Sequence, residues 1–81
     1  MKVRIRLFAS FREAVGGGTL HWDASVGTTV GQVVAALQQE YPGLGPAAEK
    51  ALLAVNQEYV GRELVLHDGD ELALIPPVSG G

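Results

Sequence analysis

The sequence predicts an α+β domain in which one helix packs across a mixed β-sheet. Three features support this class. Residues 2–8 alternate strictly between polar and apolar side chains, and residues 29–41 carry an apolar stripe with helical spacing. Short apolar runs separated by turn residues fill the second half of the chain. At 81 residues, the chain has the length of one domain.

The first segment, KVRIRLF at 2–8, has the pattern of a half-buried strand. Val3, Ile5 and Leu7 point to one face, and the basic residues point to the other. Phe8 shares the basic face. A large aromatic ring at the end of a charged row is a poor candidate for the core, so Phe8 needs another explanation.

Two further segments precede the main helix. ASFREAV at 9–15 is expected to form one or two helical turns before three glycines. TLHWDA at 19–24 predicts a hairpin partner of the first strand, with Leu20 and Trp22 on one face. Because a strand follows the glycines, a hairpin connection is favoured over a phosphate-binding loop, which needs a helix N-terminus there.

The clearest helix is predicted within residues 29–41. Thr29 and Gln32 have the spacing of a capping box, and Pro42-Gly43 is expected to end the helix. The apolar side chains recur at intervals of three and four and form one stripe: Val30, Val33, Val34, Leu37 and Tyr41.

The second half reads as short strands. ALLAV at 51–55 predicts a strand, NQE a turn and YV the stub of another strand. HDGD at 67–70 predicts a reverse turn, since Asp-Gly is a strong turn pair. ELALI at 71–75 predicts the last strand, with Ile75 on the face opposite the two leucines.

Composition excludes several classes of function. The formal net charge is −3 and there is no long basic run, which argues against a nucleic-acid partner. The chain has no cysteine, which excludes disulfides, thiolate metal sites and a cysteine nucleophile. No segment has the pattern of a signal peptide or a membrane span, so we expect a cytoplasmic protein without a membrane partner.

No internal group of residues predicts catalysis or a metal site. His21 and His67 lack metal-ligand spacing. Asp68 and Asp70 flank one glycine but lack the other ligands of a calcium loop, so a turn is favoured. No serine lies in a nucleophile-elbow context. We therefore expect no catalytic residue and no metal.

The C-terminal segment PPVSGG, at 76–81, is the one that suggests chemistry. Pro76 and Pro77 cannot continue a central strand and favour a stiff, extended backbone. Gly80 and Gly81 have no Cβ, so these peptide units fit a narrow channel. Such a tail spans roughly 20 Å and can deliver its carboxylate into another protein's active site. The carboxylate is an anion at neutral pH and needs activation before it forms a bond. A frayed end is the alternative.

A resemblance to a known family rests on three segments in a fixed order: VRIRLFASFREAVG, LLAVNQEYV and LHDGDELALIPPVSGG. Together they resemble the small, sulfur-carrying subunit of molybdopterin synthase over nearly the whole chain. That family has the ubiquitin-like β-grasp fold. The resemblance thus implies a β-grasp domain at 1–75 and a projecting tail at 76–81, made of Pro76, Pro77, Val78, Ser79, Gly80 and Gly81.

The resemblance implies a sulfur-transfer cycle centred on Gly81. An E1-like adenylyltransferase uses ATP to adenylate the Gly81 carboxylate, and a sulfur donor protein converts the adenylate to a thiocarboxylate. The tail then enters the large subunit of molybdopterin synthase, where the sulfur passes to precursor pterin and forms the dithiolene. The chain itself is implied to be a non-catalytic subunit without a stably bound cofactor. The lack of cysteine is consistent with this cycle, because the C-terminal carboxylate is then the place where the chain can carry the sulfur.

The resemblance also implies a partner interface. If the first and last strands are parallel neighbours, as in the family, Phe8 and Ile75 lie side by side where the tail departs. Tyr59 matches an apolar contact position of the family and extends this patch. The alternative is that a loop or the tail itself covers these side chains.

Three other functions stay open. The sulfur carrier of thiazole synthesis, in thiamine formation, is also a glycine-terminated β-grasp protein, although such chains are usually shorter and lack the PPV step. A ubiquitin-like interaction module whose tail is never activated belongs to a different class. An independent enzyme is the remotest alternative.

Overall fold

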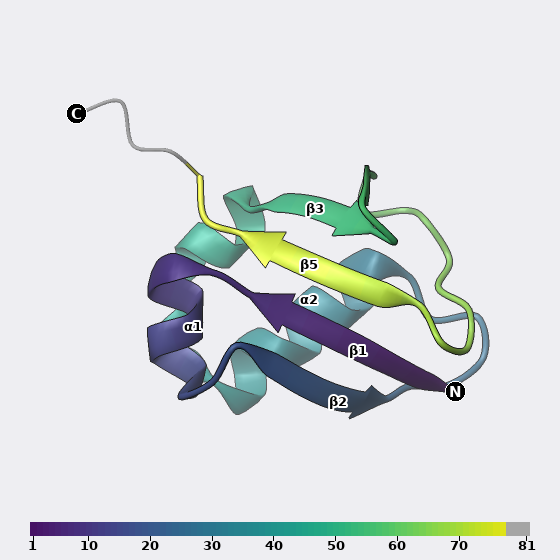
Figure 1. Cartoon of the computed structure of the whole chain (residues 1–81), viewed down its shortest axis with the longest axis horizontal. Coiled ribbons are helices and arrows are strands. Elements are labelled where there is room, and N and C mark those ends of the chain that lie inside the picture. The colour runs from purple at the N-terminus through teal and green to yellow at the C-terminus, as the bar shows by residue number, and fades with distance from the viewer. Residues whose placement is uncertain (78–81) are drawn as a thin grey trace.

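The computed structural model describes residues 1–77 and contains a five-stranded mixed sheet of order β2-β1-β5-β3-β4 (Figure 1). The strands are β1 (Lys2–Leu7), β2 (Thr19–Asp23), β3 (Leu52–Val55), β4 (Glu58–Tyr59) and β5 (Glu71–Ile75). The helices are α1 (Ala9–Val15) and α2 (Val30–Glu40), with 3-10 helices η1 (Pro42–Leu44) and η2 (Pro46–Lys50). The predicted α+β class is confirmed.

β1 lies inside the sheet, antiparallel to β2 and parallel to β5. Its alternate residues Val3, Ile5 and Leu7 are buried, as the sequence pattern predicts. The predicted strand over 2–8 ends one residue earlier, because Phe8 is the N-cap of α1. The chain turns sharply there, and Ala9 adopts a φ of 49°.

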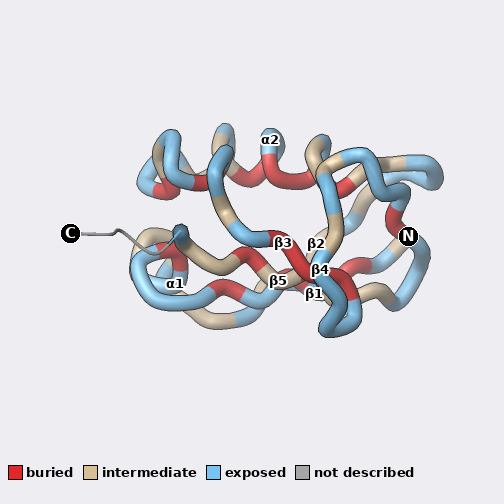
Figure 2. The backbone as a smooth tube through the Cα atoms, turned by 90° about the horizontal axis from the view of Figure 1, so that it is seen from above, coloured by how far each residue is buried: buried red, intermediate tan, exposed pale blue. Residues whose placement is uncertain are grey.

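Helix α2 crosses one face of the sheet, and α1 lies at one end of it (Figures 1 and 2). The capping box is confirmed: the Thr29 N–H donates to Gln32 Oε1 at 2.9 Å, and the Gln32 N–H donates to Thr29 Oγ1 at 3.3 Å. Four of the five predicted stripe residues are buried in α2. Tyr41 is instead the C-cap and is half-buried beside the core.

Gly31, in the first turn of α2, has a packing role. Its N–H donates to the carbonyl of Arg62 at 2.9 Å, and a Cβ at this position would lie 3.1 Å from the Cβ of Arg62. The close approach of the two backbones explains why a residue of low helix propensity stands there.

The connection after α2 holds two 3-10 helices that the sequence did not predict. Pro42 and Pro46 stand at their first positions, where a missing N–H costs nothing. Leu44 and Ala48 are buried and close one end of the core. Such short elements carry no periodic signal.

The core lies between α2 and the sheet. Its fifteen buried residues come from all the described elements except β2 and β4, and from the segment before β5: Val3, Ile5, Leu7, Phe11, Val30, Val33, Val34, Leu37, Leu44, Ala48, Leu53, Val55, Leu66, Leu72 and Leu74. Within residues 1–77 no helix covers the opposite face of the sheet (Figure 2).

Polar side chains fasten the β3–β4 hairpin to the start of β5. Asn56 and Gln57 form its two-residue turn with φ of 50° and 72°, as type I′ geometry requires. The Asn56 side chain donates to Asp70 Oδ1 at 2.9 Å and accepts from the Glu71 N–H at 3.1 Å. Asp70 also accepts from the His67 N–H at 2.8 Å. The segments VNQ and DGDE thus form one structural unit, which we call the polar clamp.

Asn56→Ala should lower the free energy of unfolding by about 1–3 kcal/mol. It removes two hydrogen bonds and leaves an alanine in the left-handed region. Urea denaturation measures the loss. Gln57→Gly is the matched control, since a positive φ favours glycine, and we expect unchanged or raised stability. A loss below about 0.3 kcal/mol for Asn56→Ala would contradict a structural role for the clamp.

The two phenylalanines should differ sharply in their contribution to folding. Phe11 is 2% exposed in the core, whereas Phe8 is 37% exposed outside it. Phe11→Ala should cost about 3–5 kcal/mol of unfolding free energy. Phe8→Ala should cost about 1 kcal/mol or less. Urea midpoints of the two variants compare them directly, and equal losses would mean that Phe8 belongs to the core.

Candidate functional site

The open face of the sheet carries a shallow groove of about 240 Å³, which we call the outer groove. Side chains from β1, the N-cap of α1, β3, β5 and the β3–β4 hairpin line it: Arg6, Phe8, Ala54, Gln57, Tyr59, Glu71, Ala73 and Ile75. The groove therefore gathers residues from both halves of the chain on one face.

The register of the strands determines which residues lie at the centre of the groove. Arg6 pairs with Ala73, Ala73 with Ala54, and Ala54 with Tyr59, so one row crosses four strands on the same face. The two alanines end at Cβ, while the residues at the ends of the row are long. The hollow arises from this contrast in side-chain length.

Phe8 and Ile75 lie at the end of the groove where the chain leaves the sheet. They directly follow Leu7 and Leu74, which are the last register partners of β1 and β5. Leu52 pairs with Ile75 and is 46% exposed on the same face. The structure brings together the three residues that the sequence analysis proposed, since Phe8, Tyr59 and Ile75 all line one groove.

Tyr59 is the most exposed of these apolar side chains, at 75%, whereas Phe8 is 37% exposed. No loop or helix within residues 1–77 covers the groove, and several large apolar side chains are left in water. An exposed apolar patch of this kind, with polar residues at its rim, is typical of a protein interface.

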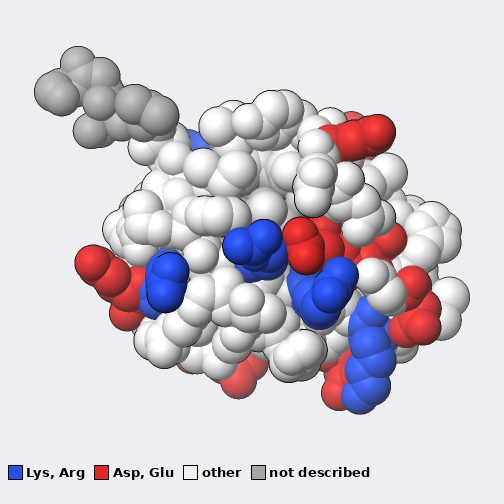
Figure 3. Space-filling model, in the orientation of Figure 1, with Lys and Arg blue, Asp and Glu red and all other residues white. Residues whose placement is uncertain are grey.

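Several charged side chains lie on the same face (Figure 3), and two of them, Arg6 and Glu71, line the groove itself. The Arg6 guanidinium lies 5.4 Å from the centroid of the Phe8 ring, a cation–π distance. Arg4 pairs with Glu71 at 3.6 Å. The face thus has an apolar end near the exit of the chain and a charged end near the start of β1.

At the charged end, the Lys2 ammonium contacts the Asp23 carboxylate at 2.7 Å. Hydrogen bonding and charge attraction hold the pKa of Asp23 below its ordinary value and the pKa of Lys2 above it. The Asp23 contribution to stability is present above the unfolded-state pKa and is lost as pH falls. Because both side chains are exposed, the pair stabilises the fold only slightly.

The chain leaves the sheet beside the outer groove (Figure 1). β5 ends at Ile75, and Pro76 is half-buried while Pro77 is exposed. The other four residues of the predicted tail lie outside the described residues: Val78, Ser79, Gly80 and Gly81. The role of the Gly81 carboxylate therefore stays a prediction.

Most of the other residues considered as candidate sites lie in a helix cap or in turns, where they make hydrogen bonds or ion-pair contacts. Gly16, with φ of 87°, caps the C-terminus of α1, and its N–H donates to the Arg12 carbonyl, so the glycines do not open a helix. His67 lies 4.0 Å from Asp70 in the polar clamp, and Asp68 accepts from the Lys2 N–H at 2.7 Å. In residues 1–77 no three His, Cys, Asp or Glu side chains are placed to hold a metal ion. None of the helices described is long and apolar enough to cross a membrane.

Sequence reasoning did not single out two residues of this surface that lie on β3, Leu52 and Ala54. The run ALLAV is apolar on both faces, so its sequence does not tell which side chains point outward. The register with Ile75 and Tyr59 supplies that information only after the sheet has formed.

Comparison with known sequences gives a consistent picture. The model of the ThiS family matches residues 5–81. The molybdopterin synthase sulfur carrier subunit of Mycobacterium tuberculosis is 42% identical, with 100% of this chain and 99% of the relative covered. Small archaeal modifier protein 3 of Haloferax volcanii is 39% identical, with both chains covered completely, at 100%.

Solved structures agree with the sequence comparison. The Haloferax volcanii HVO 2177 protein matches with a TM-score of 0.92 and 34% identity, over 100% of this chain and 87% of that chain. A chain in the complex of subunits 1 and 2 of molybdopterin-converting factor from Helicobacter pylori matches with a TM-score of 0.70 and 27% identity, over 100% of both chains. Ubiquitin of Caldiarchaeum subterraneum shares the fold, with a TM-score of 0.64 and 22% identity, over 100% of this chain and 98% of that chain. The chain belongs to the ThiS family and has the ubiquitin-like β-grasp fold.

Proposed function

We propose that this chain is the sulfur carrier subunit of a molybdopterin synthase and that its outer groove docks the large subunit. The observation that carries the proposal is the position of the groove: an uncovered apolar surface lies beside the point where the chain leaves the sheet. The full-length similarity to a relative of that name supports the same function. The Helicobacter pylori complex supports a large-subunit partner.

In this proposal the Gly81 carboxylate is the reacting group. An E1-like enzyme binds ATP, and a carboxylate oxygen of Gly81 attacks the α-phosphorus while pyrophosphate leaves. Sulfur at the sulfide level, delivered by a donor protein, then attacks the carbonyl carbon of the acyl adenylate, so that AMP leaves and a thiocarboxylate remains. The chain supplies neither a cofactor nor an acid–base group, and its part is to carry and present the sulfur.

The outer groove and the tail have separate tasks in the proposed complex. Phe8, Ile75 and Tyr59 seat the domain on the large subunit, and one buried aromatic anchor typically contributes about 2 kcal/mol or more to binding. The tail from Pro76 to Gly81 spans roughly 20 Å when extended, which reaches an active site inside the partner. Pro76 and Pro77 restrict the backbone and so lower the entropy lost when the tail enters a channel.

Two alternatives differ in what happens to the tail. A sulfur carrier of thiazole synthesis follows the same activation with a different acceptor, so the large subunit that co-purifies decides between the two carriers. A modifier or interaction module is the second candidate, because one relative 39% identical to this chain is named a small archaeal modifier protein. A modifier forms a conjugate with another protein, and an inactive module keeps an unaltered carboxylate.

Deleting Gly81 should abolish adenylation and thiocarboxylate formation while the urea midpoint stays nearly unchanged, because residues beyond the sheet contribute few core contacts. Intact-mass spectrometry after incubation with the activating enzyme, ATP and the sulfur donor measures the oxygen-to-sulfur exchange. The full chain in the same mixture is the positive control. Pterin synthesis supported by the truncated chain would refute the assignment of Gly81.

Phe8→Asp should weaken association with the large subunit at least about tenfold, because a charge replaces an apolar anchor. Isothermal titration calorimetry with the purified large subunit measures the affinity. Val26→Asp is the matched control, since Val26 is 91% exposed and lies outside the groove. Normal binding by folded Phe8→Asp protein would show that the groove is not part of the interface.

A further inference from the structure

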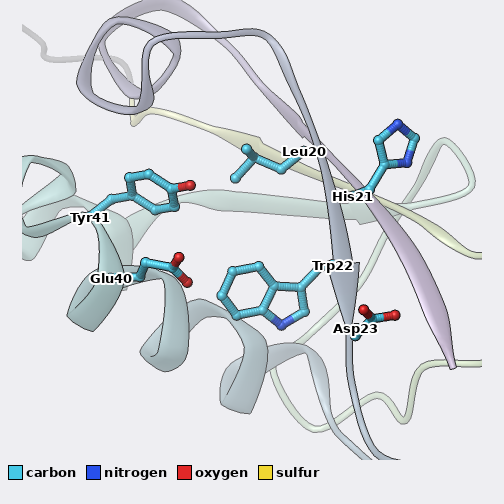
Figure 4. A pocket seen from close by; sticks show the side chains of 6 residues that line it. All are labelled: Leu20, His21, Trp22, Asp23, Glu40 and Tyr41. Carbon is cyan, nitrogen blue, oxygen red and sulfur yellow. The ribbon is translucent and has the colours of Figure 1, made fainter.

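A second hollow, of about 350 Å³, lies between β2 and the C-terminal end of α2 (Figure 4). We call it the edge pocket. It is lined by Leu20, His21, Trp22 and Asp23 of β2, and by Glu40 and Tyr41 at the end of α2. Figure 4 shows the Glu40 carboxylate between the ring of Tyr41 and the indole of Trp22. No part of the proposed sulfur-transfer function uses this pocket.

The pocket runs along a free strand edge, since β2 stands at the end of the sheet order. The Ala24 N–H donates to the Met1 carbonyl at 3.0 Å, and the Leu7 N–H donates to the Gly18 carbonyl at 3.0 Å. Hydrogen bonding alternates along an antiparallel pair, so every second residue of β2 bonds to β1. The intervening residues, Thr19, His21 and Asp23, turn their N–H and C=O groups away from the sheet.

An unpaired edge of this kind is a template for another strand. Side chains of an added strand would alternate between the two faces, as they do in β2. Those on the α2 side would enter the edge pocket, beside Leu20 and Trp22. A backbone edge and a side-chain pocket are therefore available to the same extended segment.

The electrostatics of the pocket favour a cation. Glu40 is the last residue of α2, at the negative end of the helix dipole, and the last turn contains no basic residue. Among residues 1–77 Glu40 forms no ion pair, whereas Asp23 is paired with Lys2. Without a cation beside it, a carboxylate at the C-terminal end of a helix destabilises that helix. Trp22 and Tyr41 flank it with aromatic rings, which attract cations.

We propose that the edge pocket binds an extended segment of a partner protein that carries a lysine or arginine. The segment adds to β2 through the outward backbone groups of Thr19, His21 and Asp23. Its basic side chain enters between Trp22 and Tyr41 and pairs with Glu40. Because no residue of β2 lines the outer groove, this segment and a partner in the outer groove can bind at the same time.

Trp22 is the chain's single tryptophan, so its fluorescence reports directly on the pocket. The probe is the acetylated, amidated peptide Val-Thr-Lys-Thr-Val, titrated into the full chain. We expect a saturable change in Trp22 emission at millimolar peptide or below. Amide NMR shifts should concentrate at Thr19, His21 and Asp23, the residues of the free edge.

Matched probes separate the parts of the proposal. Glutamate in place of the peptide lysine should abolish binding, and N-methylation of the peptide amides should do the same by removing strand pairing. Glu40→Gln should weaken binding about fivefold, as expected for one partly exposed ion pair. Glu58→Gln, on the opposite edge of the sheet, is the control and should leave the affinity unchanged.

Three results would overturn the proposal. The first is no saturable change at millimolar peptide. The second is equal binding of the lysine and glutamate peptides, which would exclude recognition of a cation. The third is equal binding of the N-methylated peptide or of free lysine amide, which would make the pocket a small-cation site without strand addition.

Discussion

The parallel pairing of β1 with β5 is the constraint on which the rest of the structure depends. Parallel neighbours cannot be joined by a tight turn, so the intervening chain must cross over, and it supplies α2 to cover one face. The pairing also joins the first strand to the last. Phe8 and Ile75 thereby lie at the same end of the sheet and line one groove, and the chain leaves the sheet beside them. Without this pairing, neither the outer groove nor its position at the exit would exist.

Local patterns account for the parts of the fold that the sequence predicted correctly. The alternation of β1, the capping box of α2 and the Asp-Gly turn each depend on neighbouring residues, so they are visible before folding. The 3-10 helices lack a periodic signal, and the floor of the outer groove depends on strand register. Ala54 was missed for that reason. The edge pocket was missed because Trp22 and Glu40 converge only when α2 packs on the sheet.

Two of the motifs within the segments that carried the resemblance, VNQ and DGDE, have a structural role. Asn56 and Asp70 hold the β3–β4 hairpin against β5, and the turn they stabilise positions Tyr59 at the rim of the outer groove. The proposed partner surface is instead apolar and its residue types are ordinary. A recognisable motif can therefore mark the residues that build a surface, while the contact residues themselves remain inconspicuous in the sequence.

The two alanines at the floor of the outer groove keep the groove open, but they stabilise their strands less than larger residues would. Alanine is a weak strand former, and a β-branched residue at Ala54 or Ala73 would suit a central strand better. The added methyl groups, however, would fill the hollow that the row of short side chains leaves open. Selection for stability alone would favour closing this depression, so leaving it open suits a partner surface with a ridge that fits into it.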